Sequence, residues 1–271
     1  MTLQISPGPV RTLFGLLGLL GIVWLWATLL LLAEPHPGFT LHAEGDALRF
    51  ATAPDGPQLP ADARVVSIAR PGGTPFAVGP TDLIEEPDFF DTYEAMQRFF
   101  ARQGELRTLL DEPFVLTWAA DAAGSGGKID ISPRKRGLAQ LPATFWFQLG
   151  CGSIASVIGL WVLLLRPQAW SARMLALTGF AYLLITVPAA IYSSRAIALD
   201  PALFRLLAAG NHLGAFLFGC GLITLMWSYP RPLGTPRWLL LPFAIYLPWW
   251  LADTARLAPD QDWGSRIPIM S

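Results

Sequence analysis

Charged side chains are scarce in this sequence. Its 271 residues include 19 basic and 20 acidic side chains, or 14% of the chain, whereas soluble globular domains average about 25%. Apolar residues make up 53%, which predicts a membrane-embedded protein. The net charge of −1 gives no indication of a nucleic-acid partner.

Cysteine and histidine are also rare, and this excludes several kinds of site. The two cysteines, Cys151 and Cys220, lie inside apolar runs, which argues against a disulfide framework or a zinc site. The three histidines lie far apart in sequence. The chain has no HExxH, GxSxG or GxxxxGK[ST] motif. We therefore expect no catalytic residue, metal or cofactor, and a chain that is not an enzyme.

The sequence contains five long apolar runs. A span needs about 17–25 apolar residues. Gly15, Gly18 and Gly21 form a smooth strip on the first run, which predicts close packing against a neighbouring helix. About five transmembrane helices are predicted; the last is short and interrupted by prolines, so a re-entrant segment is its alternative. The runs are Leu13 to Ala33, Ala143 to Leu165, Met174 to Tyr192, Leu203 to Tyr229, and Trp238 to Ala252.

Most charges are concentrated between residues 35 and 142, where 15 acidic and 10 basic residues fall. This predicts an anchor at 1–34, a small α/β domain at 35–142 and a membrane block at 143–271. Within the domain, LHAEGDALRFATA predicts a strand pair, and ARVVSIA, FVLTWAA and KIDIS predict further strands. DTYEAMQRFFARQGELRTLL predicts a helix capped by Asp91 or Thr92 and ended or kinked at Gly104.

Arginines in the short loops predict how the chain threads the membrane. Arg166 and Arg173 share one loop, and Arg231 and Arg237 share another two spans later. Because positive loops stay cytoplasmic, residues 35–142 should be extracytoplasmic. The Arg134–Arg136 cluster lies on the side predicted to be external, but large translocated domains cross largely regardless of charge.

The run from Leu203 to Trp227 carries two adjacent polar residues, Asn211 and His212. Asp200 and Pro201 form a helix start, which places His212 about 16 Å along the axis, near the outer edge of the hydrocarbon. Gly210 and Gly214 flank the pair with close-packing spacing. The pair therefore either bonds to a neighbouring helix or forms a ligand-binding or proton-sensing site.

Two further candidate residues, Tyr192 and Arg195, follow the third run. Aromatic and basic side chains at a span end are typical of interfacial anchors. The alternative is that they bind an anionic ligand at the outer surface.

Several stretches together resemble the N-terminal sensor region of bacterial membrane-bound histidine kinases, through about Asp262. They are PTDLIEEPDFFDTYEAMQRFFARQ, ISPRKRGL, AAIYSSRAIALDPALFRLLAAGNHLGAFLFG and YPRPLG. The resemblance implies an anchor helix, a PDZ-like extracytoplasmic domain, a multi-helix block, an inner-membrane location and dimerisation. No phosphoacceptor or nucleotide-binding box is present, so the kinase core is absent and the membrane block is expected to be truncated.

Three hypotheses follow. The first is the non-catalytic sensing module of a two-component system, which binds an extracytoplasmic or membrane-borne small molecule or peptide. The second is a stand-alone membrane scaffold whose external domain binds a partner protein or peptide. The third, part of a membrane enzyme, needs a catalytic constellation that the sequence does not supply.

Overall fold

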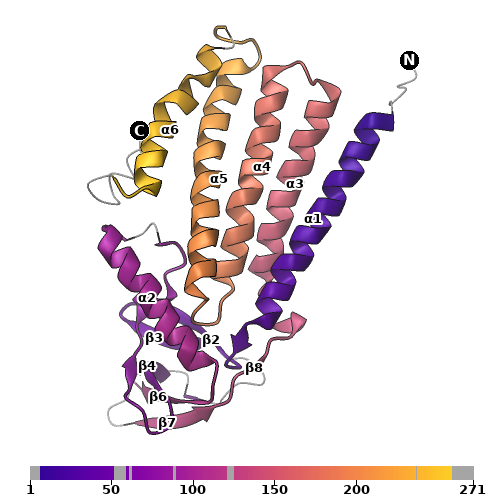
Figure 1. The fold of residues 1–271 in the computed structure, drawn as a ribbon. Helices are drawn as coiled ribbons and strands as arrows, with labels where there is room; N and C mark the ends of the chain where they lie inside the picture. The colour runs from indigo at the N-terminus through magenta and orange to yellow at the C-terminus, as the bar shows by residue number, and fades with distance from the viewer. Residues whose placement is uncertain are drawn as a thin grey trace.

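A bundle of long apolar helices stands on a small α/β domain, as the computed structural model shows (Figure 1). The structure describes residues 7–51, 59–60, 63–87, 90–120, 125–235 and 237–257. The connections α3–α4 and α5–α6 lie at the end of the bundle away from the domain (Figure 1). The domain meets only the other end.

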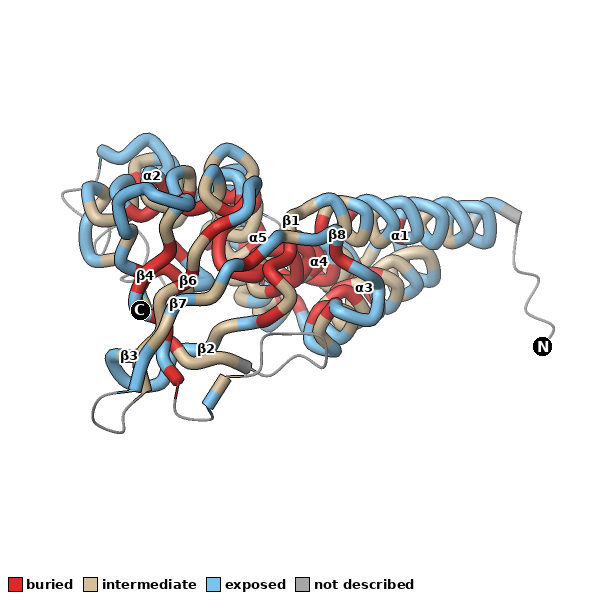
Figure 2. The backbone as a smooth tube through the Cα atoms, turned by 90° about the horizontal axis from the view of Figure 1, so that it is seen from below, coloured by how far each residue is buried: buried red, intermediate tan, exposed pale blue. Residues whose placement is uncertain are grey.

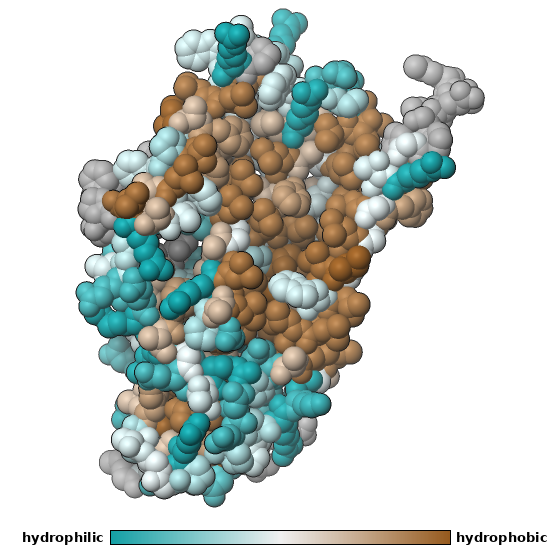
Figure 3. All heavy atoms as spheres, viewed as in Figure 1, coloured by the Kyte–Doolittle hydropathy of each residue, from teal (hydrophilic) through white to brown (hydrophobic). Residues whose placement is uncertain are grey.

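Within the part of the chain that the structure describes, four helices are long and apolar enough to cross a bilayer: α1 (Pro7–Ala33), α3 (Ala143–Leu165), α4 (Trp170–Ser193) and α5 (Pro201–Ser228). Each is at least 23 residues long, or about 34 Å at 1.5 Å per residue, against a hydrocarbon core of roughly 30 Å. Figure 3 shows hydrophobic atoms over the bundle and hydrophilic atoms over the domain. The prediction of a helical membrane protein is supported.

The fifth apolar run, predicted over 238–252 as a short span or a re-entrant segment, is helical but too short to be a candidate span. It forms a 3-10 turn, η4 (Trp238–Leu240), and a 14-residue helix, α6 (Leu241–Thr254). That helix is about 21 Å long, less than the hydrocarbon thickness. The structure thus supports four candidate spans where the sequence predicted about five, and α6 falls outside the four.

Glycines set the spacing of α3, α4 and α5. A Cβ at Gly179 would lie 2.4 Å from the carbonyl oxygen of Ala155, and one at Gly214 would lie 2.9 Å from that of Ala181. Since no side chain fits there, these helices approach backbone to backbone. In Figure 2 the buried segments include much of α4, which lies between its two neighbours.

The glycine strip of α1 behaves differently, and its predicted close packing is wrong. A Cβ at Gly15, Gly18 or Gly21 would meet nothing within 4 Å. Helix α1 instead contacts α3 through larger side chains, including a hydrogen bond of 2.9 Å from Trp24 Nε1 to Ser153 Oγ. Small residues permit close approach but do not compel it.

The domain is built on an antiparallel sheet in the order β2-β3-β4-β6-β7, with β5 also paired to β4. The predicted strands are confirmed. A separate two-stranded ribbon pairs β1 with β8 and joins the two ends of the domain beside α1 and α3. The strands are β1 (Pro35–His36), β2 (Thr40–Glu44), β3 (Ala47–Ala51), β4 (Ala63–Ala69), β5 (Phe76–Ala77), β6 (Phe114–Ala120), β7 (Gly126–Ile131) and β8 (Arg134–Lys135). A PDZ-like topology is not confirmed.

One helix, α2 (Tyr93–Leu110), packs on this sheet. Thr92 caps it, because its Oγ1 accepts a hydrogen bond of 3.1 Å from the amide of Ala95. The helix continues through Gly104, so the predicted end or kink there is wrong. A Cβ on Gly104 would lie 3.0 Å from Cγ of Pro201, so this glycine lets α2 approach the start of α5.

The domain and the bundle share their cores. Ile197 and Ala198, from the connection between α4 and α5, are buried in the core of the domain. In return, Phe99 and Phe100 of α2 pack against Phe204 of α5, with ring centroids 5.5 and 5.6 Å apart. The two parts are therefore interlocked.

Gln103 of α2 bridges the two parts at this junction. Its side chain is fully buried; Nε2 donates to the carbonyl of Asp82 at 3.0 Å, and Oε1 accepts from the amide of Leu199 at 3.3 Å. One amide group thus satisfies a buried carbonyl of the domain and a buried amide of the membrane block.

Replacing Gln103 with Met keeps the volume but removes both hydrogen bonds. The amide of Leu199 is then left unsatisfied, at a cost of about 1–3 kcal/mol, whereas the carbonyl of Asp82 still accepts from Arg195. We therefore expect Gln103→Met to lower the thermal midpoint of the full chain in detergent by several degrees. Gln97→Met, on the exposed face of α2, is the matched control and should leave the midpoint within a degree or so of wild type. Equal midpoints for the two variants would contradict the bridging role.

Candidate functional site

The adjacent polar residues of α5 face different neighbours. Asn211 turns toward α4, where its Nδ2 donates to the carbonyl of Ile185 at 3.2 Å and to the hydroxyl of Tyr192 at 2.9 Å. Tyr192 is 2% exposed. Asn211 thus hydrogen-bonds to a neighbouring helix beside the close contact at Gly214, as one of the two sequence interpretations expects.

His212 turns toward α6. Its Nδ1 lies 3.4 Å from Oδ2 of Asp253, whose Oδ1 accepts a hydrogen bond of 2.5 Å from the hydroxyl of Tyr93. Asp253 is 6% exposed, and a buried carboxylate needs such partners. The three side chains come from α5, α6 and α2, so the site joins the membrane block to the domain.

The sequence analysis did not identify Asp253 or Tyr93 as site residues. Asp253 is one of only five acidic residues outside positions 35–142, and it ends an otherwise apolar run. An acidic residue in that setting is a functional-site signal. Its pairing with His212 could not be read from spacing, because 41 positions separate them.

A cavity of about 450 Å³ opens beside this triad, between α2, α5 and α6. It lies beyond the end of α6, which reaches only the level of His212, so the first turns of α5, about 16 Å of its length, face α2 there. The lining includes the whole triad. The residues are Pro87, Tyr93, Met96, Phe100, Arg205, Leu206, Ala208, Ala209, Gly210, His212, Leu213, Trp250, Asp253, Thr254 and Arg256.

Arg195 lies inside the junction instead of on the surface. Its guanidinium donates to the carbonyls of Tyr192 at 2.7 Å and Ile84 at 2.5 Å, and it lies 5.0 Å from the ring centroid of Phe204. Burial lowers the pKa of Arg195 to about 10. Neither Tyr192 nor Arg195 lines the cavity, so the structure gives both of them structural contacts.

A second group of buried basic residues lies where the domain meets α1. Arg136 donates to the carbonyl of Ser194 at 2.6 Å, which fixes the α4–α5 connection from the other side. His36 is 3% exposed, and its Nδ1 accepts from the amide of Gly38 at 2.9 Å. Burial, with a smaller contribution from the charge of Arg136, lowers the pKa of His36 to about 4.

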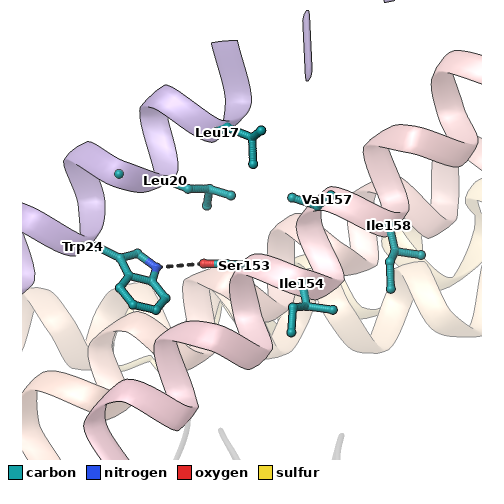
Figure 4. Close-up of a pocket in the computed structure, with 8 residues that line it drawn as sticks. Leu17, Leu20, Trp24, Ser153, Ile154, Val157 and Ile158 are labelled. Atoms are coloured by element: carbon teal, nitrogen blue, oxygen red, sulfur yellow. Dashed lines mark hydrogen bonds between the residues drawn. The ribbon is translucent and has the colours of Figure 1, made fainter. Parts of the chain in front are cut away.

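Another cavity, of about 440 Å³, lies between α1 and α3 (Figure 4). Its walls are aliphatic side chains such as Leu17, Leu20 and Val157, and the hydrogen bond from Trp24 to Ser153 lies at one edge. No titratable group lines it. It therefore offers apolar packing only.

Among the described residues, no group of three histidine, cysteine, aspartate or glutamate side chains is placed to hold a metal ion. Cys151 and Cys220 are both free thiols. No protein-family model, curated protein or solved structure matches the chain. The geometry of the junction between α2 and the membrane block is therefore the feature that bears on function.

The buried imidazole of His36 gives a pH dependence with a definite sign. The unfolded chain takes up this proton near pH 6.5, whereas the folded protein takes it up only near pH 4. Stability is therefore full above pH 6.5 and falls as the pH drops toward 4, by at most about 3 kcal/mol at 1.4 kcal/mol per pKa unit.

In His36→Asn the side-chain oxygen can still accept from Gly38 but does not titrate. We expect its thermal midpoint to fall less than that of wild type between pH 7 and pH 4.5. The control is His42→Asn, at an exposed position on β2, which should follow wild type. If the thermal midpoint of His36→Asn falls as much as that of wild type between pH 7 and pH 4.5, other titratable groups cause the decline.

Proposed function

We propose that the chain is the non-catalytic signal-sensing module of a two-component sensor histidine kinase and that its ligand binds in the cavity between α2, α5 and α6. The observation that carries the proposal is the shared wall of this cavity. Tyr93 comes from the domain, while His212 and Asp253 come from the membrane block. A ligand that binds one arrangement of these elements better than another shifts their equilibrium.

The interlocked cores support transmission of such a shift. Helix α2 lines the cavity through Met96 and Phe100, and the same helix holds the α4–α5 connection through Gln103. A displacement of α2 therefore acts directly on the ends of α4 and α5. Glycine-spaced packing of α3 against α4 and of α4 against α5 provides the further path to the opposite end of the bundle.

An artificial occupant of the cavity tests this function. Ala209 is an exposed residue in the cavity wall, and Ala209→Trp places an indole there. We expect the distance between spin labels at positions 98 and 166, in a background without Cys151 and Cys220, to change by about 1–2 Å, the scale of helix shifts in switching proteins. The distance is measured by double electron–electron resonance on the full chain in lipid nanodiscs.

Ala202→Trp is the matched control, because Ala202 is exposed on the same helix but does not line the cavity. It should leave the distance distribution unchanged. If Ala209→Trp also leaves it unchanged, the cavity does not communicate with the far end of the bundle, and the scaffold hypothesis is the better one.

The orientation belongs to the same proposal. Arg166 and Arg173 lie at the α3–α4 connection, and Arg231 at the α5–α6 connection, both away from the domain (Figure 1). If that end is cytoplasmic, as positive loops usually are, the domain is extracytoplasmic and the membrane is the bacterial inner membrane.

A reporter enzyme fused after Gly104 tests this orientation. We expect alkaline phosphatase, which works only outside the cytoplasm, to be active there, and a cytoplasmic fluorescent protein fused after Arg231 to be bright. The opposite pattern at both positions would reverse the threading.

A further inference from the structure

The cavity between α2, α5 and α6 has two arginines on its domain-facing side and a largely apolar wall along α5. Helices α5 and α6 run antiparallel (Figure 1), so the start of α5 and the end of α6 lie on the same side. Arg205, in the second turn of α5, and Arg256, just after α6, both line the cavity on that domain-facing side. Among the described residues neither arginine takes part in an ion pair, and the Arg205 guanidinium lies over the ring of Phe100, 5.1 Å from its centroid.

Most of the remaining wall is apolar, apart from the triad of His212, Asp253 and Tyr93 at the level of Leu213. Leu206, Ala209 and Leu213 follow one face of α5, and Met96 and Trp250 line the cavity from α2 and α6. From Arg205 to Leu213 the cavity wall extends about 12 Å along the axis of α5. Over this length α5 passes from the junction with the domain into the hydrophobic part of the bundle.

The one carboxylate of the cavity does not cancel the charge of the two arginines. Asp253 is held by the hydroxyl of Tyr93 and lies beside His212. The two arginines outnumber Asp253 among the acidic and basic side chains of the cavity wall. An anion is favoured where the two guanidiniums lie, because arginine binds phosphate and carboxylate through paired N–H donors.

We propose that this cavity binds an anionic amphiphile, with its phosphate or carboxylate headgroup on Arg205 and Arg256 and its apolar chain along Leu206, Ala209 and Leu213. This deepens the proposed function by naming the ligand class. A volume of about 450 Å³ lies within the range of roughly 300–1,000 Å³ that ligand sites occupy. The amphiphile can reach the site from the bilayer, as an anionic phospholipid, or from water, as a free fatty acid.

Photolabelling of the full chain in nanodiscs distinguishes these sources. One arm uses phosphatidylglycerol with a diazirine on its acyl chain, a second uses phosphatidylcholine with the same chain, and a third uses a diazirine fatty acid added to phosphatidylcholine discs. Mass spectrometry maps the labelled residues. We expect labelling of residues 206–213 or 250 by at least one anionic probe, at least about tenfold above the zwitterionic probe, since the cationic choline of that probe is repelled by the two arginines and offsets the attraction of its phosphate.

Arg205→Gln with Arg256→Gln should reduce this labelling to the zwitterionic level. Arg166→Gln with Arg173→Gln, at the far end of the bundle, is the matched control and should retain it. Phosphatidylglycerol labelling identifies a bilayer source, and labelling by the fatty acid alone identifies a free one; both support the proposal.

Equal labelling by the anionic and zwitterionic probes overturns the anionic class, while a ligand site in the cavity would stand. Labelling that persists after both arginines are replaced likewise overturns the anionic class. Absence of cavity labelling by every probe overturns the amphiphile, and the response to Ala209→Trp then decides separately whether the cavity transmits a signal. The comparison of probes on the wild-type chain needs no variant, so it holds even if a substitution disturbs folding.

Discussion

The connection between α4 and α5 passes through the interior of the protein, and a buried main chain must keep its amides and carbonyls hydrogen-bonded. Side chains of the domain supply most of the partners described above. Gln103 accepts from the amide of Leu199, and Arg136 donates to the carbonyl of Ser194. Arg195 lies on the connection itself and donates to the carbonyls of Ile84 and Asp82 in the domain. This requirement explains why a membrane protein with so few charges buries Arg136 and partly buries Arg195 against this connection.

The same constraint positions the candidate site. Because Gln103 and the aromatic contacts of Phe99 and Phe100 fix α2 on the end of α5, the first turn of α2 extends along the bundle to the level of α6. There Tyr93 meets Asp253. The cavity is consequently bounded by elements whose relative position depends on the interlocked cores, and an occupant that changes the position of α2 must also disturb the buried connection.

The sequence predicts features that depend on local chemistry and misses those that depend on distant contacts. Hydropathy over more than 20 residues identifies α1, α3, α4 and α5, and the Asp200–Pro201 start is confirmed by a hydrogen bond of 2.9 Å from the amide of Leu203 to Asp200. Gly214 is close-packed as its spacing indicates, but the similar strip on α1 is not, because spacing does not say whether a partner helix lies opposite. His212 was found as a polar residue in an apolar run, whereas its partner Asp253 required the tertiary fold.

The shortness of α6 explains why Asp253 lies beside His212. A helix of 14 residues that began level with the end of α5 reaches about 21 Å down a neighbour of about 42 Å. It therefore ends against α5 well before the start of that helix, and the buried carboxylate at its last turn would be costly without partners. His212 lies at the matching level on α5, and Tyr93 reaches it from the domain, so both halves of the chain contribute to stabilising that carboxylate. The two polar residues of α5 thus make separate contacts: Asn211 holds α5 to α4, and His212 lies beside the buried Asp253 at the end of α6.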